Sequence, residues 1–155
     1  MVYVLSVLAL DLATHTGYAL ASGVELRSGF ITLDRGGRRV RVSRQQRVAR
    51  LWKRLTKLKV DVLVLETPQH FRSIAAAEIA FGLYAVANLY ADQLGIEVFG
   101  VQPTRLKRWA TGSGAAKKLE MVTAARAMFP APRIYSNDQA DALLLLGYYR
   151  TELVQ

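Results

Sequence analysis

The sequence predicts a layered α/β fold in which helices flank a mixed five-stranded sheet. The expected strands and helices follow the order βββαβαβααα along the chain. Two of the strand segments, residues 2–10 and 61–65, are short and almost continuously apolar, as is typical of strands buried on both faces. The chain has 155 residues, 52% of them apolar, so we expect residues 1–155 to form a single domain with a substantial core.

The first three strands are expected to form an antiparallel meander. The opening apolar run contains only one polar residue, Ser6, and ends in the carboxylate Asp11. A small, Gly-containing turn then leads into a second strand at Tyr18–Ser22, and Gly23 turns the chain into a third strand at Glu25–Leu33. Connections this short join antiparallel neighbours. Residues 34–42 (DRGGRRVRV) follow as a basic, glycine-containing loop.

A basic amphipathic helix is expected after Ser43, which is a suitable N-cap. Five apolar residues between positions 48 and 58 recur at helical spacing. Six basic residues occupy the remaining face: Arg44, Arg47, Arg50, Lys53, Arg54 and Lys57. Such a face is either a solvated helix surface or a contact surface for phosphates, and the pattern leaves both interpretations open.

The centre of the chain predicts a fourth strand followed by a long apolar helix. Residues 61–65 (DVLVL) end in a second carboxylate, Glu66, after which a Thr-Pro pair stops the strand. Residues Ser73 to Leu94 then predict a helix whose length approaches that of a membrane span. Glu78 and Asn88 lie inside it, and the other elements form a soluble domain, so we expect no membrane insertion. Because the helix is apolar almost all round, it should bury a second face in a homodimer.

The last third of the chain is expected to add one strand and three helices. Residues 96–101 (IEVFGV) predict the fifth strand, and Pro103 begins a short helix that breaks at residues 111–114 (TGSG). Two further helices are expected, at Lys117 to Met128 and from Asn137 to about Thr151.

The overall charge predicts a polyanionic partner. Lys and Arg number 21 against 12 Asp and Glu, which gives a net charge of +9 and a pI near 10.2. Nucleic acid is the favoured partner, and an acidic membrane surface is the alternative. The chain has no Cys, which excludes disulfides and thiolate chemistry. No signal peptide is recognisable at the N-terminus, so we expect a cytoplasmic protein.

Four acidic residues stand out by their placement. Asp11 and Glu66 each end a buried strand, and Asp138 and Asp141 share one face at the start of the last helix. The helix dipole favours an acidic residue in the first turn, which would explain the position of Asp138. It would not explain the position of Asp141, which begins an apolar run. Four converging carboxylates need a neutralising cation, and oxygen ligands without Cys select Mg²⁺ or Mn²⁺. Two such ions can hydrolyse a phosphodiester.

Four stretches distributed over the whole chain resemble the RuvC family of Holliday-junction resolvases, within the ribonuclease H-like superfamily. They are DLATHTGYA, VLVLE, TRLKRWATGSGAAKKLEMV and NDQADALLL. The resemblance implies a ribonuclease H-like fold, a homodimer, and paired symmetric nicks in four-way DNA junctions. It also implies that the four carboxylates bind two Mg²⁺ ions, with Mn²⁺ as a possible substitute. Lys107 and Lys118 match basic residues that lie near the scissile phosphate in the family.

Several further residues are expected to contact DNA. Members of the family carry an aromatic shortly after the strand-end Glu, and here Phe71 comes later than that pattern predicts. His70 and Phe71 are therefore candidates for stacking on a base, although Phe71 could equally be a core residue. The remaining candidates are the basic residues Arg72, Arg105 and Lys117. Lys117 is a weaker candidate than its neighbour Lys118. His15, in the turn after Asp11, is interpreted as a surface residue rather than a metal ligand.

Other functions are compatible with parts of this pattern. A related ribonuclease H-like nuclease could act on other branched DNA, flaps, R-loops or RNA–DNA hybrids. A strand-end Asp followed by a Thr/Gly turn also begins the phosphate loop of actin-like ATPases and sugar kinases, but those need two such domains. A non-catalytic DNA-binding protein would leave the strand-end carboxylates unexplained, because acids there weaken phosphate binding.

Overall fold

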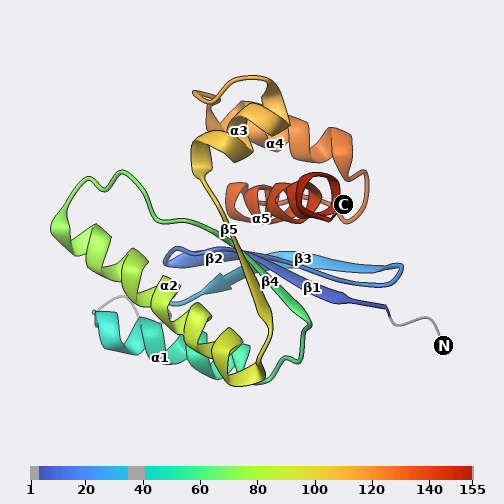
Figure 1. Ribbon diagram of the computed structural model, residues 1–155. Helices are drawn as coiled ribbons and strands as arrows, with labels where there is room; N and C mark the ends of the chain where they lie inside the picture. Colours follow the sequence, from blue (N-terminus) through green and yellow to red (C-terminus); the bar gives the residue numbers. More distant parts are fainter. Residues whose placement is uncertain (1–3, 35–40, 155) are drawn as a thin grey trace.

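The computed structural model describes residues 4–34 and 41–154, and it confirms the predicted α/β class (Figure 1). Five strands form one mixed sheet in the order β3-β2-β1-β4-β5. The strands are β1 Ser6–Asp11, β2 His15–Ser22, β3 Glu25–Thr32, β4 Val62–Glu66 and β5 Glu97–Val101. The helices are α1 Arg44–Leu55, α2 Ile74–Leu94, α3 Pro103–Thr111, α4 Lys118–Met128 and α5 Asn137–Tyr148, and a π-helical turn, η1 Tyr149–Leu153, follows α5.

The sheet separates two helical layers. Figure 1 shows α1 and α2 on one side of the strands and α3, α4 and α5 on the other. Side chains of β1 alternate between these layers, as in any strand buried on both faces. Val7 and Ala9 belong to the core under α5, whereas Leu8 and Leu10 belong to the core under α1 and α2. The continuous apolar run of β1 is therefore explained by burial on both sides.

The first strand pair differs from the expectation at its ends. β1 begins at Ser6, where pairing with Ser22 begins, and Val4 and Leu5 before it are about half exposed. The first residues of the expected strand, 2–3, and most of the expected basic loop, 35–40, lie outside the described residues. β2 begins at His15, earlier than expected, because the turn after Asp11 is short and the hairpin with β3 extends to the pair His15 and Thr32.

The helix ends follow local capping chemistry. Ser43 caps α1 through a reciprocal capping box with Gln46, and the Ser73 hydroxyl accepts a hydrogen bond from the Ala76 N–H at the start of α2. α2 ends at Gly95, whose φ of 64° is the left-handed conformation that glycine adopts without strain. Lys117 is the N-cap of α4 rather than its first residue, and α5 ends at Tyr148, short of the expected Thr151.

Helix α2 buries one face and exposes another. Leu83, Ala87 and Tyr90 pack against α1 and the sheet, while Phe81 and Leu89 are about half exposed. Within the described part of the chain, α2 is also the one helix long and apolar enough to cross a membrane. Length and composition alone do not distinguish such a helix from the core helix of a soluble protein.

Candidate carboxylate site

Asp11 and Glu66 leave the sheet side by side. β1 and β4 are adjacent parallel strands, with Leu10 paired to Leu65, so the residue that follows each of these lies at the same edge of the sheet. Both carboxylate residues line a cavity of about 130 Å³ at that edge. The carboxyl ends of parallel strands are where open sheets bind their ligands. The strand register alone therefore brings the first two predicted site residues together.

Helix α5 brings the other two carboxylates to the same edge. Asp138 lies in its first turn and Asp141 lies three residues later, so both occupy one face. The helix packs directly on β1 and β2, and its N-terminal turn touches the backbone at Gly17. A Cβ atom at Gly17 would overlap the Asp138 carbonyl group and lie 3.1 Å from the Asp138 Cα. Glycine at this position permits the close approach that places Asp138 and Asp141 over Asp11.

Gln139, between the two aspartates, fixes the first turn of α5. Its side chain is almost fully buried and makes three hydrogen bonds to other segments. Nε2 donates to the Ser28 hydroxyl of β3 at 2.9 Å and to the Arg133 carbonyl at 3.0 Å, and Oε1 accepts from the Tyr135 N–H at 2.8 Å. A buried side-chain amide whose hydrogen bonds are all made is confined to one orientation. Any other orientation would leave a buried polar group without a partner, which costs free energy. Gln139 therefore orients the helix turn that carries Asp138 and Asp141.

The carboxylates are close enough to perturb one another. Burial, followed by the charges of Glu66, Asp141 and Asp138, raises the pKa of Asp11 well above its ordinary value. Burial and then Asp141 raise the pKa of Glu66 to about 7, and burial and then Asp138 raise the pKa of Asp141 to about 6. Desolvation and like charge both disfavour the ionised form, so the site is short of positive charge.

Two lysines act in the opposite direction. Lys107, on α3, lowers the pKa values of Glu66 and Asp141, and Lys118, at the start of α4, lowers those of Asp11 and Asp141. Both side chains are therefore close enough to the carboxylates to stabilise their ionised forms. Their position near a scissile phosphate stays a prediction. Against four carboxylates, these two cations leave an excess of negative charge.

The chemistry of the site fits hard divalent cations. All four candidate ligands are carboxylates, which Mg²⁺ and Mn²⁺ prefer, and the raised pKa values of three of them indicate uncompensated negative charge. In the described ranges 4–34 and 41–154, no three His, Asp or Glu side chains meet tightly enough to ligate one ion as they stand. In this arrangement of the side chains, the ligand shell of an ion is therefore not closed.

The loop after Glu66 places Phe71 beside the site. Phe71 lines the same cavity as Asp11 and Glu66, and its ring packs on Phe81 of α2 at 5.2 Å between centroids. It is about one-third exposed, so it is not a core residue. His70 precedes it with a φ of 54°, and His70 and Arg72 are both exposed. The displaced aromatic of the sequence thus lies next to the carboxylates.

The remaining sequence candidates lie on the protein surface. Lys117 is exposed at the N-cap of α4. Arg105 is exposed and lines a separate cavity with Trp109 and Tyr148. His15 is exposed and contacts Thr32 and Phe30, in agreement with its interpretation as a surface residue.

Sequence reasoning did not single out Gly17 or Gln139, although both position the aspartates. A Thr-Gly pair at the start of a strand was the available signal for Gly17. Gln139 lies between two acidic residues on a helix, and nothing in that local pattern indicates a buried amide with partners on β3.

Solved structures with known roles share this fold, whereas no protein-family model and no curated protein sequence matches the chain. The RuvC structure of Thermus thermophilus superposes with a TM-score of 0.67 at 20% identity, covering 94% of this chain and 95% of that chain. T. thermophilus RuvC in complex with Holliday junction substrate gives 0.71 at 18% identity, covering 91% and 90%. The yeast mitochondrial Holliday junction resolvase gives 0.58 at 14% identity, covering 90% and 75%.

These likenesses identify the structural class. The chain has the α/β fold of RuvC nucleases and of Holliday junction resolvases, and the predicted ribonuclease H-like architecture is confirmed. The likeness spans at least 90% of the chain.

Proposed function

We propose that the chain is a RuvC-family nuclease, a single domain over residues 1–155, that resolves four-way DNA junctions by paired symmetric nicks. The observation that carries the proposal is the convergence of Asp11, Glu66, Asp138 and Asp141 at one buried edge of a strongly basic protein. Positive charge outside attracts a polyanion, and concentrated negative charge inside attracts divalent cations. The shared fold with resolvases supports the junction as the substrate.

The four carboxylates are proposed as ligands of two Mg²⁺ ions, with Mn²⁺ as a possible substitute. When bound, such a pair activates a water molecule and stabilises the leaving oxygen of a phosphodiester. The protein contributes a rigid arrangement of the ligands. The strand register fixes the positions of Asp11 and Glu66. The contacts of Gly17 and Gln139 fix the helix turn that carries Asp138 and Asp141. Holding ligands in place before the reaction avoids reorganisation during it.

Lys107 and Lys118 are proposed to contact the scissile phosphate. Each lies within electrostatic reach of two of the carboxylates, on the side formed by α3 and α4. An ammonium group there can bind the phosphate and stabilise charge that develops as the bond breaks. Exposed residues around the site are proposed to hold the DNA: Lys117, Arg105, Arg72, His70 and Phe71.

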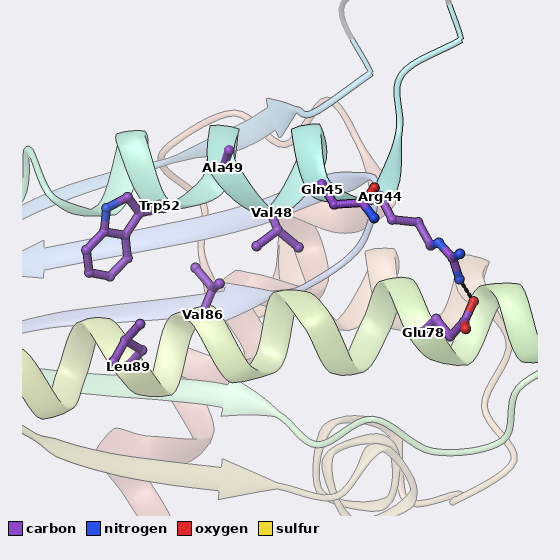
Figure 2. A pocket seen from close by; sticks show the side chains of 8 residues that line it. All are labelled: Arg44, Gln45, Val48, Ala49, Trp52, Glu78, Val86 and Leu89. Atoms are coloured by element: carbon purple, nitrogen blue, oxygen red, sulfur yellow. Dashed lines mark ion pairs between the residues drawn. The ribbon is translucent and has the colours of Figure 1, made fainter.

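Helix α2 is proposed to form the homodimer that two symmetric nicks require. Ile74, Phe81 and Leu89 recur on its solvent side, at intervals of seven and eight residues, and they are 81%, 53% and 48% exposed. A groove of about 500 Å³ between α1 and α2 continues this apolar surface, with Val48, Val86 and Leu89 in its lining (Figure 2). Exposed apolar stripes of this kind mark protein interfaces, so we expect dimerisation rather than membrane insertion, in a cytoplasmic protein.

A cleavage panel with mapped cuts tests the function. Four-way junction, three-way junction, flap, R-loop and RNA–DNA hybrid are compared with Mg²⁺ and with Mn²⁺, using wild type, Asp11→Asn and Asp141→Asn. We expect paired symmetric nicks on the four-way junction, abolished in both variants while junction binding is retained. Glu97→Gln is the matched control, because Glu97 begins a parallel strand and lies at the opposite edge of the sheet.

The panel also contains the outcomes that would contradict the proposal. Cleavage restricted to flaps, R-loops or hybrids would reassign the substrate and leave the metal chemistry intact. Normal metal-dependent cutting by Asp11→Asn or Asp141→Asn would refute the metal assignment. Calorimetric titration with Mn²⁺ gives a readout that does not depend on any DNA substrate, and both variants should lose most of the binding.

A further inference from the structure

The arginines in the first half of α1 are engaged in contacts within the fold. Arg44 forms an ion pair with Glu78 across the groove shown in Figure 2. Arg47 Nε donates to Asp34 Oδ1 at 2.6 Å, and Arg50 Nη1 donates to the Leu33 carbonyl at 2.6 Å. These three arginines therefore hold α1 against α2 and the end of β3, and their charges are used within the fold.

The second half of the same face has no such partners. Within the described residues, neither Arg54 nor Lys57 makes a side-chain hydrogen bond or an ion pair, and both are exposed. Arg27 of β3 adds a third cation nearby, and among the described residues it pairs with Glu25 at 3.2 Å in a largely exposed setting. An exposed pair of that kind is worth less than ~1 kcal/mol, so Arg27 can exchange its partner at little cost.

These three residues, the rim cations, surround an apolar cavity of about 300 Å³. Its floor is formed by side chains of the sheet and its wall by the end of α1, and the apolar lining includes Leu10, Tyr18, Leu20, Ile31, Leu55 and Leu58. The volume is at the lower end of the ~300–1,000 Å³ range of ligand pockets. The cavity therefore has room for one or two large side chains rather than for a large molecule.

The cavity lies away from the carboxylate site. Its floor residues Leu8 and Leu10 face the layer of α1 and α2, whereas Asp138 and Asp141 are carried by α5 on the other face of the sheet. On this face of the sheet, β2 contributes Tyr18 and Leu20 to the lining of the cavity, and β3 contributes Ile31. Any ligand bound here would approach from the side opposite to α5.

We propose that the apolar cavity with its rim cations binds an acidic segment of a partner protein that carries a large apolar side chain next to a run of Asp or Glu residues. Charge complementarity selects the occupant: three cations stand at the mouth, and the floor is apolar. A DNA backbone would pair with the cations but would leave the apolar floor in water. A purely apolar ligand would fill the floor but would leave the cations without compensation.

Fluorescence anisotropy with designed peptides tests the proposal on the full chain. The probe is a labelled peptide with four consecutive aspartates followed by Phe and Leu, in an otherwise Gly-Ser sequence. We expect saturable binding below ~1 mM, and a loss of about tenfold to a hundredfold when Phe and Leu are replaced by Ser. The double variant Arg54→Glu/Lys57→Glu should weaken binding of the original peptide at least about tenfold.

A matched double variant distinguishes the site from general attraction to a basic protein. Lys53→Glu/Lys59→Glu makes the same charge change on exposed residues that do not line the cavity, and it should retain binding. Amide chemical shifts of Leu20, Ile31 and Leu58 should move on titration with the peptide. Both double variants should fold normally, because all four side chains are exposed, and should cleave DNA as wild type does.

Three results would overturn the proposal. One is the absence of saturable peptide binding, and another is equal weakening by both double variants. The third is that Arg54→Glu/Lys57→Glu weakens binding of four-way junctions, or of vesicles rich in acidic lipid, while the peptide does not bind. In that case, the rim cations are a DNA or membrane contact. None of these results bears on the nuclease proposal, which is tested separately by the carboxylate variants.

Discussion

The substitution Gly17→Ala would test how the position of helix α5 affects the proposed function of its carboxylates, Asp138 and Asp141. The added Cβ would overlap the carbonyl group of Asp138, and real Cβ atoms essentially never come within 3.0 Å of another heavy atom in this way. The obstacle is backbone rather than a flexible side chain, so either α5 or β2 has to move. The movement required is roughly 1 Å, a misplacement that can cost about 10²-fold in rate when reacting groups must be aligned.

We therefore expect Gly17→Ala to cleave four-way junctions about a hundredfold more slowly while binding them with an unchanged Kd. Overpacking of this kind costs about 1–3 kcal/mol of stability, and a domain of this size loses roughly 2–4 °C in Tm for each kcal/mol. Cleavage is measured in single-turnover assays well below the Tm, binding by electrophoretic mobility shift in Ca²⁺, and Mn²⁺ affinity by calorimetry. The Mn²⁺ affinity should fall together with the rate.

Gly82→Ala is the control for adding a methyl group to a tightly placed glycine. Its Cβ would lie 3.2 Å from a Val48 methyl group, which can rotate away, and the gain in helix propensity of up to ~1 kcal/mol offsets the contact. We expect wild-type cleavage and a change in stability of less than about 1 kcal/mol. If Gly17→Ala had the Tm and the cleavage rate of wild type, the close approach of Gly17 to Asp138 would have no role in placing α5. Equal losses of junction binding and cleavage would indicate general unfolding instead.

Three further predictions follow from the electrostatics and the exposed surface. In EDTA, the folded chain keeps protons on Glu66 and Asp141 at pH values where the unfolded chain has released them. The free energy of unfolding should therefore fall as pH rises from about 4 to about 7, between the ordinary carboxyl pKa values and the raised values of about 6 and about 7. Thermal unfolding across this range should show a smaller slope in Glu66→Gln/Asp141→Asn, in which the buried Asp11 alone of these three groups remains to titrate. A Tm independent of pH in wild type would contradict the assignment. Lys118→Ala should slow cleavage more than it weakens junction binding, because the ammonium group acts on charge that develops at the phosphate; equal losses would make Lys118 an ordinary phosphate contact. Phe81→Glu should convert a dimer to a monomer in sedimentation at micromolar concentration, and a wild type that sediments only as a 17.2 kDa species would refute the use of α2 as an interface.

The basic exterior and the acidic interior of this protein are arranged on different elements. Lysines and arginines gather on α1, α3 and the start of α4, whereas the four carboxylates come from the ends of two strands and from one helix. Most of the positive charge therefore lies apart from the four carboxylates. Lys107 and Lys118 are the exceptions, and both are within reach of the carboxylates because α3 and α4 pack on α5.

The sequence by itself determined the strands, the helices and the two strand-end carboxylates. Short apolar runs identify β1 and β4, and the residue after each run leaves the sheet at its edge, so Asp11 and Glu66 could be predicted to be neighbours. Ser43 and Ser73 could be predicted as caps because capping depends on residues three positions apart. These features depend on local periodicity, which a sequence displays directly.

Only the tertiary structure decided how α5 meets the sheet and which surfaces stay open. Gln139 bonds to Ser28, 111 residues earlier, and the Gly17 contact joins a strand to a helix from the other end of the chain. The cavity beside Arg54 and Lys57 likewise depends on how far α1 extends over β2 and β3. Such contacts join residues that are remote in sequence, and no local pattern specifies their distance or orientation. The identity and spacing of the four acidic residues could therefore be seen in the sequence, whereas the contacts that bring them together and the cavity beside α1 could not.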